Sequence, residues 1–161
     1  MLELFNSYRG DAQHIASVIL ALAIWRWGAA PERWLITMFL VTMVLPVRMF
    51  EWFDLGPPAL GPYAWIYVAI DIIAGIGFVA VALNANRNYP LWIAGFQLVA
   101  ISAHAVKVMV DTVSPLAYLV LATGPSYCQL ALIFGGFVRH RMRLRVFGPY
   151  RAWRAPMPLA R

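Results

Sequence analysis

Charged residues are scarce in this chain, and their scarcity argues against a soluble globular fold. They make up 12% of the 161 residues, whereas hydrophobic residues make up 62%. Soluble domains carry about 25% charged residues, and their helices keep one polar face, but the long segments here are apolar nearly all round. Strands of a membrane barrel would alternate apolar and polar residues, while Val18–Trp25 is apolar throughout. The composition therefore favours membrane-spanning helices.

Residues with catalytic or metal-binding chemistry are also few. Cys128 is the only cysteine, which excludes an intramolecular disulfide, a CxxC pair and a cysteine-rich metal site. We expect Cys128 to be a small buried side chain. The sequence contains no GxSxG, no HExxH and no glycine-rich phosphate loop. Because no catalytic candidate emerges, we expect the protein not to be an enzyme.

Five segments are long and apolar enough to be membrane spans, because about 20 helical residues cross a hydrocarbon core of about 30 Å. They are Ala12–Trp27, Pro31–Trp52, Tyr63–Leu83, Tyr89–Val110 and Pro115–Val138. We therefore expect an all-α polytopic bundle. Residues 1–161 would form a single transmembrane domain, with residues 139–161 as a basic cytoplasmic tail. The first segment is the shortest and has His14 near its start, so it could instead lie at the membrane interface.

The distribution of lysine and arginine predicts which end of the bundle is cytoplasmic. With five spans and an internal C-terminus, ten of the 13 basic residues lie inside, in accord with the positive-inside rule. These ten are Arg26, Arg33, Arg87, Arg139, Arg141, Arg143, Arg145, Arg151, Arg154 and Arg161. Arg9, Arg48 and Lys107 lie outside. We expect a bacterial inner-membrane protein with an external N-terminus and a cytoplasmic C-terminus.

Four closely spaced arginines, Arg139, Arg141, Arg143 and Arg145, follow the last span directly. A basic residue near an anionic membrane surface contributes about 1 kcal/mol to binding, so we expect this tail to contact anionic lipid headgroups. Basic residues with interleaved aromatics can also suit a nucleic acid. Proximity to the membrane favours lipid, and we predict no nucleic-acid partner.

Prolines and aromatic residues predict further details of the bundle. Pro46 and Gly124-Pro125 should kink the second and fifth spans, because proline removes a helical hydrogen bond. Tryptophans and tyrosines gather near the expected span ends, which is typical of anchoring at the membrane interface. Pro31 and Glu32 indicate a helix start, with an acid near the positive end of the helix.

One constellation of polar residues lies in the expected outer half of the bundle. Gln97, His104 and Asp111 are seven residues apart in the fourth span, and Lys107 follows His104 by three. At 3.6 residues per turn these four share one face of the helix. Asp71 of the third span lies at nearly the depth of His104, so we expect Asp71 to contact His104 or Lys107.

Other polar residues lie at matching depths. Arg48 and Glu51 are three residues apart at the outer end of the second span, level with Lys107, and Gln129 of the fifth span is near the depth of Gln97. An ionised group inside a membrane costs at least about 2.5–3.5 kcal/mol, so it should pair or face a cavity. Three interpretations stay open: a buried network that joins helices, a site for a proton, an ion or a small polar ligand, and a contact with another subunit.

The histidines bear on haem and metal binding. His14 and His104 both lie near the expected outer side, so the two could ligate one haem. Zinc sites need three or four ligands, and the sequence has no closely spaced pair. We predict no metal and no cofactor, with haem held by His14 and His104 as the remaining option.

Two classes of function compete. The first is a non-enzymatic accessory or scaffold protein, whose polar cluster holds helices together or docks a membrane partner or a second copy. The second is a small carrier or sensor that binds a proton, an ion or a small ligand through Asp71, His104 and Lys107. A carrier normally needs two access routes and a site near the membrane midplane, whereas these charges crowd toward the outer side. The sequence therefore favours the accessory interpretation.

The segment Pro90–Gln97, then Ser126-Tyr127 and Arg139-His140-Arg141, resembles small uncharacterised inner-membrane proteins of alphaproteobacteria over the last two spans. That resemblance implies a bacterial inner membrane and no particular activity. In size, number of spans and tryptophan content the chain is also similar to the tryptophan-rich sensory protein (translocator) family. The tryptophan-rich first loop and the asparagine–tryptophan pairs of that family have no counterpart here.

Overall fold

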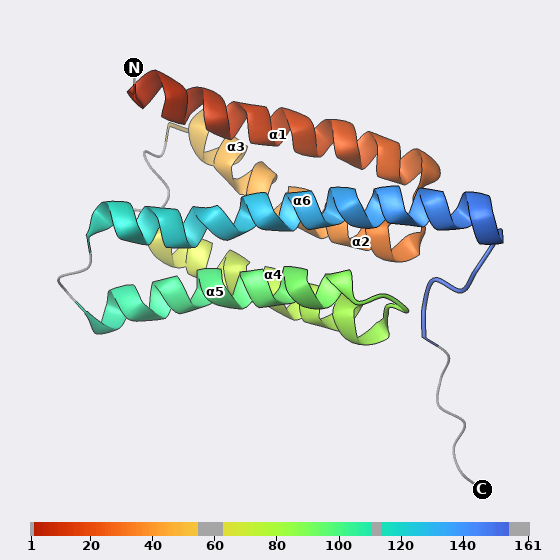
Figure 1. Ribbon diagram of the computed structural model, residues 1–161. Helices are drawn as coiled ribbons and strands as arrows, with labels where there is room; N and C mark the ends of the chain where they lie inside the picture. Colours follow the sequence, from red (N-terminus) through yellow and green to blue (C-terminus); the bar gives the residue numbers. More distant parts are fainter. Residues whose placement is uncertain (1, 55–62, 111–113, 155–161) are drawn as a thin grey trace, which may run out of the picture.

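The computed structural model describes residues 2–54, 63–110 and 114–154, and these form a bundle of long helices that run side by side (Figure 1). Its elements are α1 (Leu2–Trp27), α2 (Ala30–Phe39), η1 (Leu40–Val44), α3 (Leu45–Trp52), α4 (Ala64–Asn84), α5 (Tyr89–Met109) and α6 (Pro115–Phe147). Within the described ranges, the β-type pairing is limited to a bridge between Ala85 and Trp153. The prediction of an all-α bundle is confirmed.

Among the described residues, four helical segments are long and apolar enough, by length and composition, to cross a membrane. They are Ala30–Trp52, Trp65–Asn84, Tyr89–Met109 and Leu116–Phe147. They match the second to fifth predicted spans to within one or two residues, except at the C-terminal end of the last. Helix α1, which contains the first predicted span, is not among the four. A fifth span therefore stays a prediction.

The last helix is longer than predicted. α6 continues through Arg139 to Phe147 instead of ending at Val138, since arginine, methionine and leucine are good helix formers. It ends where Gly148 adopts a φ of 70°, a left-handed conformation that favours glycine. Pro125 lies inside α6, and the helix continues through it.

The second predicted span is interrupted near Pro46, as expected for proline. The α-helical pattern changes at Leu40 into the π-helical turn η1 and resumes as α3 at Leu45. Pro46 cannot donate a hydrogen bond to the carbonyl of residue 42 and crowds it, and a π turn is a common way to absorb such a defect. Thr42 bonds back to the Met38 carbonyl at 2.7 Å.

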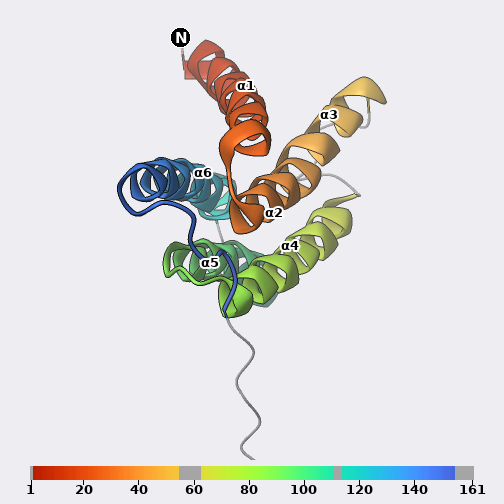
Figure 2. The same ribbon diagram turned by 90° about the vertical axis from the view of Figure 1, so that its right-hand side faces the viewer.

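Helices α4, α5 and α6 pack in sequence order, while α1 lies outside and touches α2 and α6 (Figure 1). The view along the bundle shows α1 and the α2–α3 segment diverging from the loop that joins them (Figure 2). The apolar core is centred toward that loop, where Ile24, Phe39, Phe78, Ile93 and Ile133 are fully buried. The bundle is therefore most tightly packed at the end that carries the α1–α2 and α4–α5 loops and the C-terminal end of α6.

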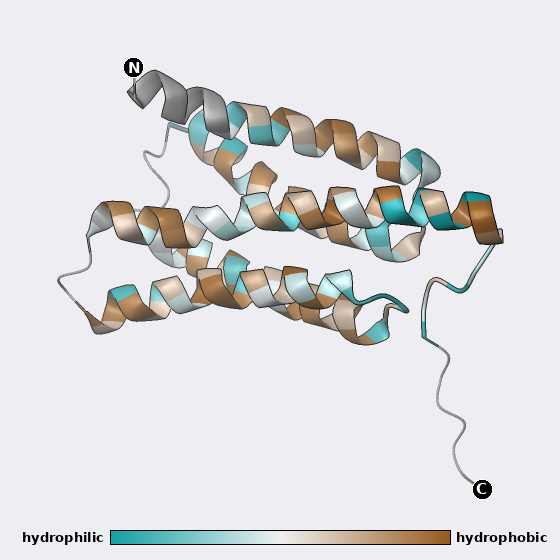
Figure 3. Cartoon of the chain, viewed as in Figure 1, coloured by the Kyte–Doolittle hydropathy of each residue, from teal (hydrophilic) through white to brown (hydrophobic). Residues whose placement is uncertain are grey.

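Many large apolar side chains are exposed on the helices, and Figure 3 shows hydrophobic residues along the coloured helices. Trp25, Trp27, Trp34 and Trp92 are exposed near one end of the bundle, in accord with the aromatic belts of membrane proteins. Cys128 is also exposed, so the expectation that it is buried is wrong. The reason is its helical position: Gln129, one residue later, points into the bundle and is 1% exposed, which turns Cys128 outward.

Candidate functional site

Two polar clusters lie inside the bundle. The first, here called the Asp71 network, joins α4, α5 and α6 through Asp71, Gln97, His104, Tyr118 and Gln129, all of which are buried. Gln97 and His104 are seven residues apart on α5 and therefore share a face. Tyr118 and Gln129 are eleven residues apart on α6, which is about three turns. Each helix thus turns its polar side chains toward the same interior line.

The hydrogen bonds of the Asp71 network converge on one carboxylate. Gln97 Nε2 donates to Asp71 Oδ1 at 2.8 Å and to the Asp71 carbonyl at 3.2 Å. His104 Nε2 lies 2.7 Å from Asp71 Oδ2. Gln129 Nε2 in turn donates to Gln97 Oε1 at 2.9 Å and to the Ile93 carbonyl at 3.2 Å. Both oxygens of Asp71 are therefore occupied.

The same geometry determines how the protons of His104 are arranged. A carboxylate only accepts hydrogen bonds, so His104 Nε2 must carry the proton that points to Asp71. In the neutral ring His104 Nδ1 is then an acceptor, and the Tyr118 hydroxyl donates to it across 2.9 Å. The Lys107 ammonium lies 4.0 Å from the centre of the Tyr118 ring, a cation–π contact. Lys107 therefore places a cation beside Tyr118, the last residue of the network on this side of His104.

The structure brings together most of the predicted polar residues. The expected contact between Asp71 and His104 is confirmed, and Gln97, Gln129 and Lys107 join the same assembly. Asp111 lies outside the described residues. Tyr118 was missed, although its position three turns before Gln129 could have placed it on the interior face of the last span.

Arg48 and Glu51 lie elsewhere in the structure. Arg48 pairs with Glu51 at 2.7 Å and with Asp11 of α1 at 2.5 Å. All three side chains are about half exposed, so each pair contributes little to stability. The Arg48–Asp11 pair bridges α1 and α3, whereas Arg48 and Glu51 both lie on α3. Their contacts tie down α1 and do not extend the Asp71 network.

The two histidines proposed for haem, His14 and His104, lie in different surroundings. Both ring nitrogens of His104 are engaged, by Asp71 and by Tyr118, so ligation would require breaking one of these bonds. The Nδ1 atom of His14 is buried without a hydrogen-bond partner. Among the described residues, no group of three histidine, cysteine, aspartate or glutamate side chains could hold a metal ion.

The second polar cluster, here called the Arg87 cluster, lies at the end of the bundle predicted to be cytoplasmic. Glu32 of α2 is fully buried and forms an ion pair with Arg87 of the α4–α5 turn, whose side chain is 7% exposed. The Tyr89 hydroxyl donates to Glu32 Oε1 at 3.0 Å. From the sequence, Glu32 was expected to be an acid at a helix start and Arg87 to be one of the basic residues on the cytoplasmic side. Their burial depends on tertiary packing that no local pattern reveals.

The chain after α6 folds back over the Arg87 cluster. Residues 149–154 return to the α4–α5 turn, where Asn86 N donates to the Ala152 carbonyl and Arg154 N to the Asn84 carbonyl. The hydroxyl oxygen of Tyr150 lies 2.7 Å from His140 Nδ1. The Tyr150 ring contacts the guanidinium groups of Arg87 and Arg143. The basic segment predicted as a tail thus begins as helix and then packs against the bundle.

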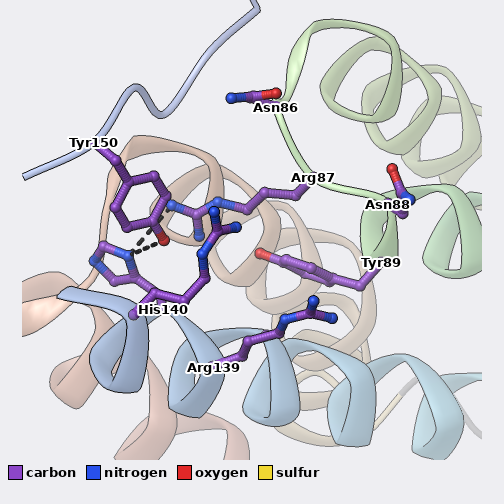
Figure 4. A pocket seen from close by; sticks show the side chains of 9 residues that line it. Asn86, Arg87, Asn88, Tyr89, Arg139, His140 and Tyr150 are labelled. Atoms are coloured by element: carbon purple, nitrogen blue, oxygen red, sulfur yellow. Dashed lines mark hydrogen bonds between the residues drawn. The ribbon is translucent and has the colours of Figure 1, made fainter. Parts of the chain in front are cut away.

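A cavity of about 220 Å³ opens beside these residues (Figure 4). Its lining is polar and basic, and comprises Asn86, Arg87, Asn88, Tyr89, Gly136, Arg139, His140, Arg143 and Tyr150. Burial lowers the pKa of Arg87 from its ordinary value, and the charge of Arg143 lowers it further. A guanidinium still remains charged at neutral pH, so the cavity wall is cationic.

Comparison with protein-family models, with curated proteins and with solved structures finds no match to this chain. Any functional argument therefore rests on the residues described above.

Proposed function

We propose that this protein is a non-enzymatic accessory or scaffold subunit of a bacterial inner membrane. Four helices long and apolar enough to span a membrane support the membrane location, and the excess of arginine at one end supports a cytoplasmic C-terminus. We propose α1 as the fifth span, which puts the N-terminus outside. The observation that carries the scaffold role is the closure of the Asp71 network.

That network uses its polar atoms on itself. Asp71 accepts from Gln97 and His104, His104 also bonds Tyr118, and Gln97 accepts from Gln129. A buried polar network whose members are all satisfied makes a structure rigid and specific. Between membrane helices such bonds help to hold neighbours together, because lipid tails are as apolar as the side chains and the hydrophobic effect does not drive the helices to associate. The pattern favours a structural lock across α4, α5 and α6.

The order of groups in the network also argues against proton carriage. A relay needs side chains that gain and lose protons in turn, as His104 and Asp71 can. On the far side of Asp71 the chain of bonds continues through Gln97 and Gln129, whose amides do not titrate. The described part of this path therefore ends at Asp71, near the outer side.

An accessory subunit needs a surface for its partner, and α1 offers one. Its outward face carries Ile15, Ile19 and Leu22, each at least 60% exposed, and α1 packs mainly on α2 and α6, with the Asp11–Arg48 ion pair joining it to α3. We propose that a membrane partner subunit or a second copy packs against this face, with lipid covering the remainder.

A small carrier or sensor is the second candidate, and the hydrogen bond between His104 and Asp71 favours it. Such a pair can accept a proton or respond to a nearby ion. In this alternative Lys107 and Asp111 would complete the site at its outer end.

Purification in mild detergent followed by reconstitution distinguishes the two. The scaffold proposal predicts a stoichiometric membrane partner or a defined oligomer by mass spectrometry, and no proton-linked flux into liposomes beyond that of protein-free vesicles. An absorption spectrum recorded on the same sample tests haem. A monomeric protein whose flux is abolished by Asp71→Asn would overturn the scaffold role in favour of the carrier.

A further inference from the structure

We propose that the cavity of the Arg87 cluster is a binding site for a phosphate group. This inference goes beyond the scaffold role and would hold equally for a carrier. It depends on three features of the cavity: its charge, an unpartnered donor and its size. The phosphate could belong to a lipid headgroup or to a small soluble phosphate compound, and the experiment below separates these sources.

The charge balance at the cavity is positive. Arg87, Arg139 and Arg143 contribute three cationic groups to the described lining, which includes no aspartate or glutamate, and Arg87 is also paired with the buried carboxylate of Glu32. The guanidinium groups of Arg87 and Arg143 both lie within 5.3 Å of the centre of the Tyr150 ring. Two cations held this close repel each other, and a shared anion would relieve that repulsion.

Arg87 also has a donor without a partner. Its side chain is 7% exposed, and its Nε atom is buried with no hydrogen-bond partner. A buried unpaired donor costs about 1–3 kcal/mol or more for a charged group, and a ligand oxygen would satisfy it. Arginine is suited to this role because its fork of N–H groups matches the oxygens of a phosphate.

The remaining lining groups fit a phosphate as well. The side-chain amides of Asn86 and Asn88 border the cavity (Figure 4), and each can donate a hydrogen bond. A cavity of about 220 Å³ is smaller than the roughly 300–1,000 Å³ usual for drug-sized ligands. A phosphate group with little attached to it is the anion that this volume admits.

The helical spacing of the arginines gives a matched control. Arg139 and Arg143 are four residues apart and line the cavity, whereas Arg141 and Arg145 line a separate apolar groove beside Trp27 and Phe137. Replacing either pair by glutamine removes the same charge from the same helix. A specific site will respond to one pair only, while general attraction to anions will respond to both.

The free-phosphate arm measures thermal unfolding of the detergent-purified protein in inorganic phosphate or glycerol phosphate, against sodium chloride of equal ionic strength. We expect a saturable rise in Tm. The apparent affinity should fall at least about tenfold in Arg139→Gln/Arg143→Gln, the loss of one charged hydrogen bond or more, and change little in Arg141→Gln/Arg145→Gln.

The lipid arm measures retained phosphatidylglycerol by native mass spectrometry after extraction from vesicles of phosphatidylglycerol and phosphatidylcholine. Retention that is lost in the Arg139/Arg143 variant and kept in the Arg141/Arg145 variant identifies a headgroup as the ligand. Single variants at Arg139 and Arg143 replace the double variant if it does not fold by circular dichroism. Equal losses in both pairs, or binding in neither arm, would overturn the proposal. If no partner subunit co-purifies with the protein, that result counts against the scaffold role and leaves the phosphate proposal unaffected.

Discussion

The Asp71 network and the Arg87 cluster are both buried polar assemblies, yet they differ in how completely they satisfy themselves. In the network, two donors occupy the two oxygens of one carboxylate, and side-chain amides continue the chain of bonds. In the cluster, cations outnumber the carboxylate, and atoms of Arg87 and Glu32 lack partners. A closed assembly of this kind stabilises a fold, whereas buried polar groups left without partners call for an explanation, for which we propose the phosphate site.

The Asp71 network and the Arg87 cluster also differ in where they lie in the bundle. The Asp71 network lies between helices and is surrounded by apolar side chains. In such surroundings the free-energy cost of an unpaired polar group is highest. The cluster lies at an end where loops and the returning C-terminal segment meet, so a cavity can form beside it. Substitutions in the two regions should therefore have different consequences for stability and for binding.

The largest loss of stability is expected for Glu32→Gln. This change leaves the buried charge of Arg87 without its partner, and breaking one side of a buried ion pair costs about 3–5 kcal/mol. The unfolding free energy in mixed detergent and dodecyl sulfate micelles measures it. The double variant Glu32→Gln/Arg87→Gln should recover most of the loss, because the uncompensated charge is gone. A double variant that is less stable than the single one would show that the ion pair is not the cause.

Asp71→Leu should cost about 2–3 kcal/mol by the same measurement. It keeps the approximate shape of the side chain but leaves Gln97 and His104 without their acceptor, and interhelical bonds in membranes contribute up to about 1.7 kcal/mol each. Ile72→Val is the control, because Ile72 is exposed on the adjacent face of α4. Equal effects at the two positions would mean that the network contributes nothing to stability.

Two adjacent glycines provide a sharper comparison at the Arg87 cluster. A Cβ atom on Gly136 would lie about 2.5 Å from the Tyr89 ring, whereas one on Gly135 would meet nothing within 4 Å. Gly136→Ala should therefore displace Tyr89 from Glu32 at a net cost of about 1–2 kcal/mol, because overpacking outweighs the gain in helix propensity. Gly135→Ala should be neutral or slightly stabilising. Thermal unfolding of the two variants measures both effects. Equal losses of stability for Gly135→Ala and Gly136→Ala would contradict the close packing of Tyr89 on Gly136.

The smallest effect is expected for Tyr118→Phe. This change removes one hydroxyl from the edge of the Asp71 network and keeps the aromatic ring, so it should cost about 0.6 kcal/mol, the average for such bonds in a membrane protein. Unfolding in micelles again measures it. A loss as large as that of Asp71→Leu would mean that Tyr118, and not Asp71, anchors the network.

The helices could be predicted from the sequence because long apolar segments are a strong and local signal. The contact of Asp71 with His104 was also accessible, since helical spacing and depth can be counted along antiparallel neighbours. The Arg87 cluster was not accessible in this way. Glu32, Arg87 and His140 come from three separate elements, and the fold-back of residues 149–154 that brings Tyr150 to them has no local pattern.

The coupling free energy between Asp71 and His104 tests the central claim most directly. It is obtained from a double-mutant cycle with Asp71→Leu, His104→Phe and the double variant, by unfolding in micelles. If the Asp71 network is a structural lock, the two substitutions together should cost about 1–2 kcal/mol less than the sum of the single losses. Losses that add to within about 0.5 kcal/mol would show that the two side chains act independently, and would contradict the account.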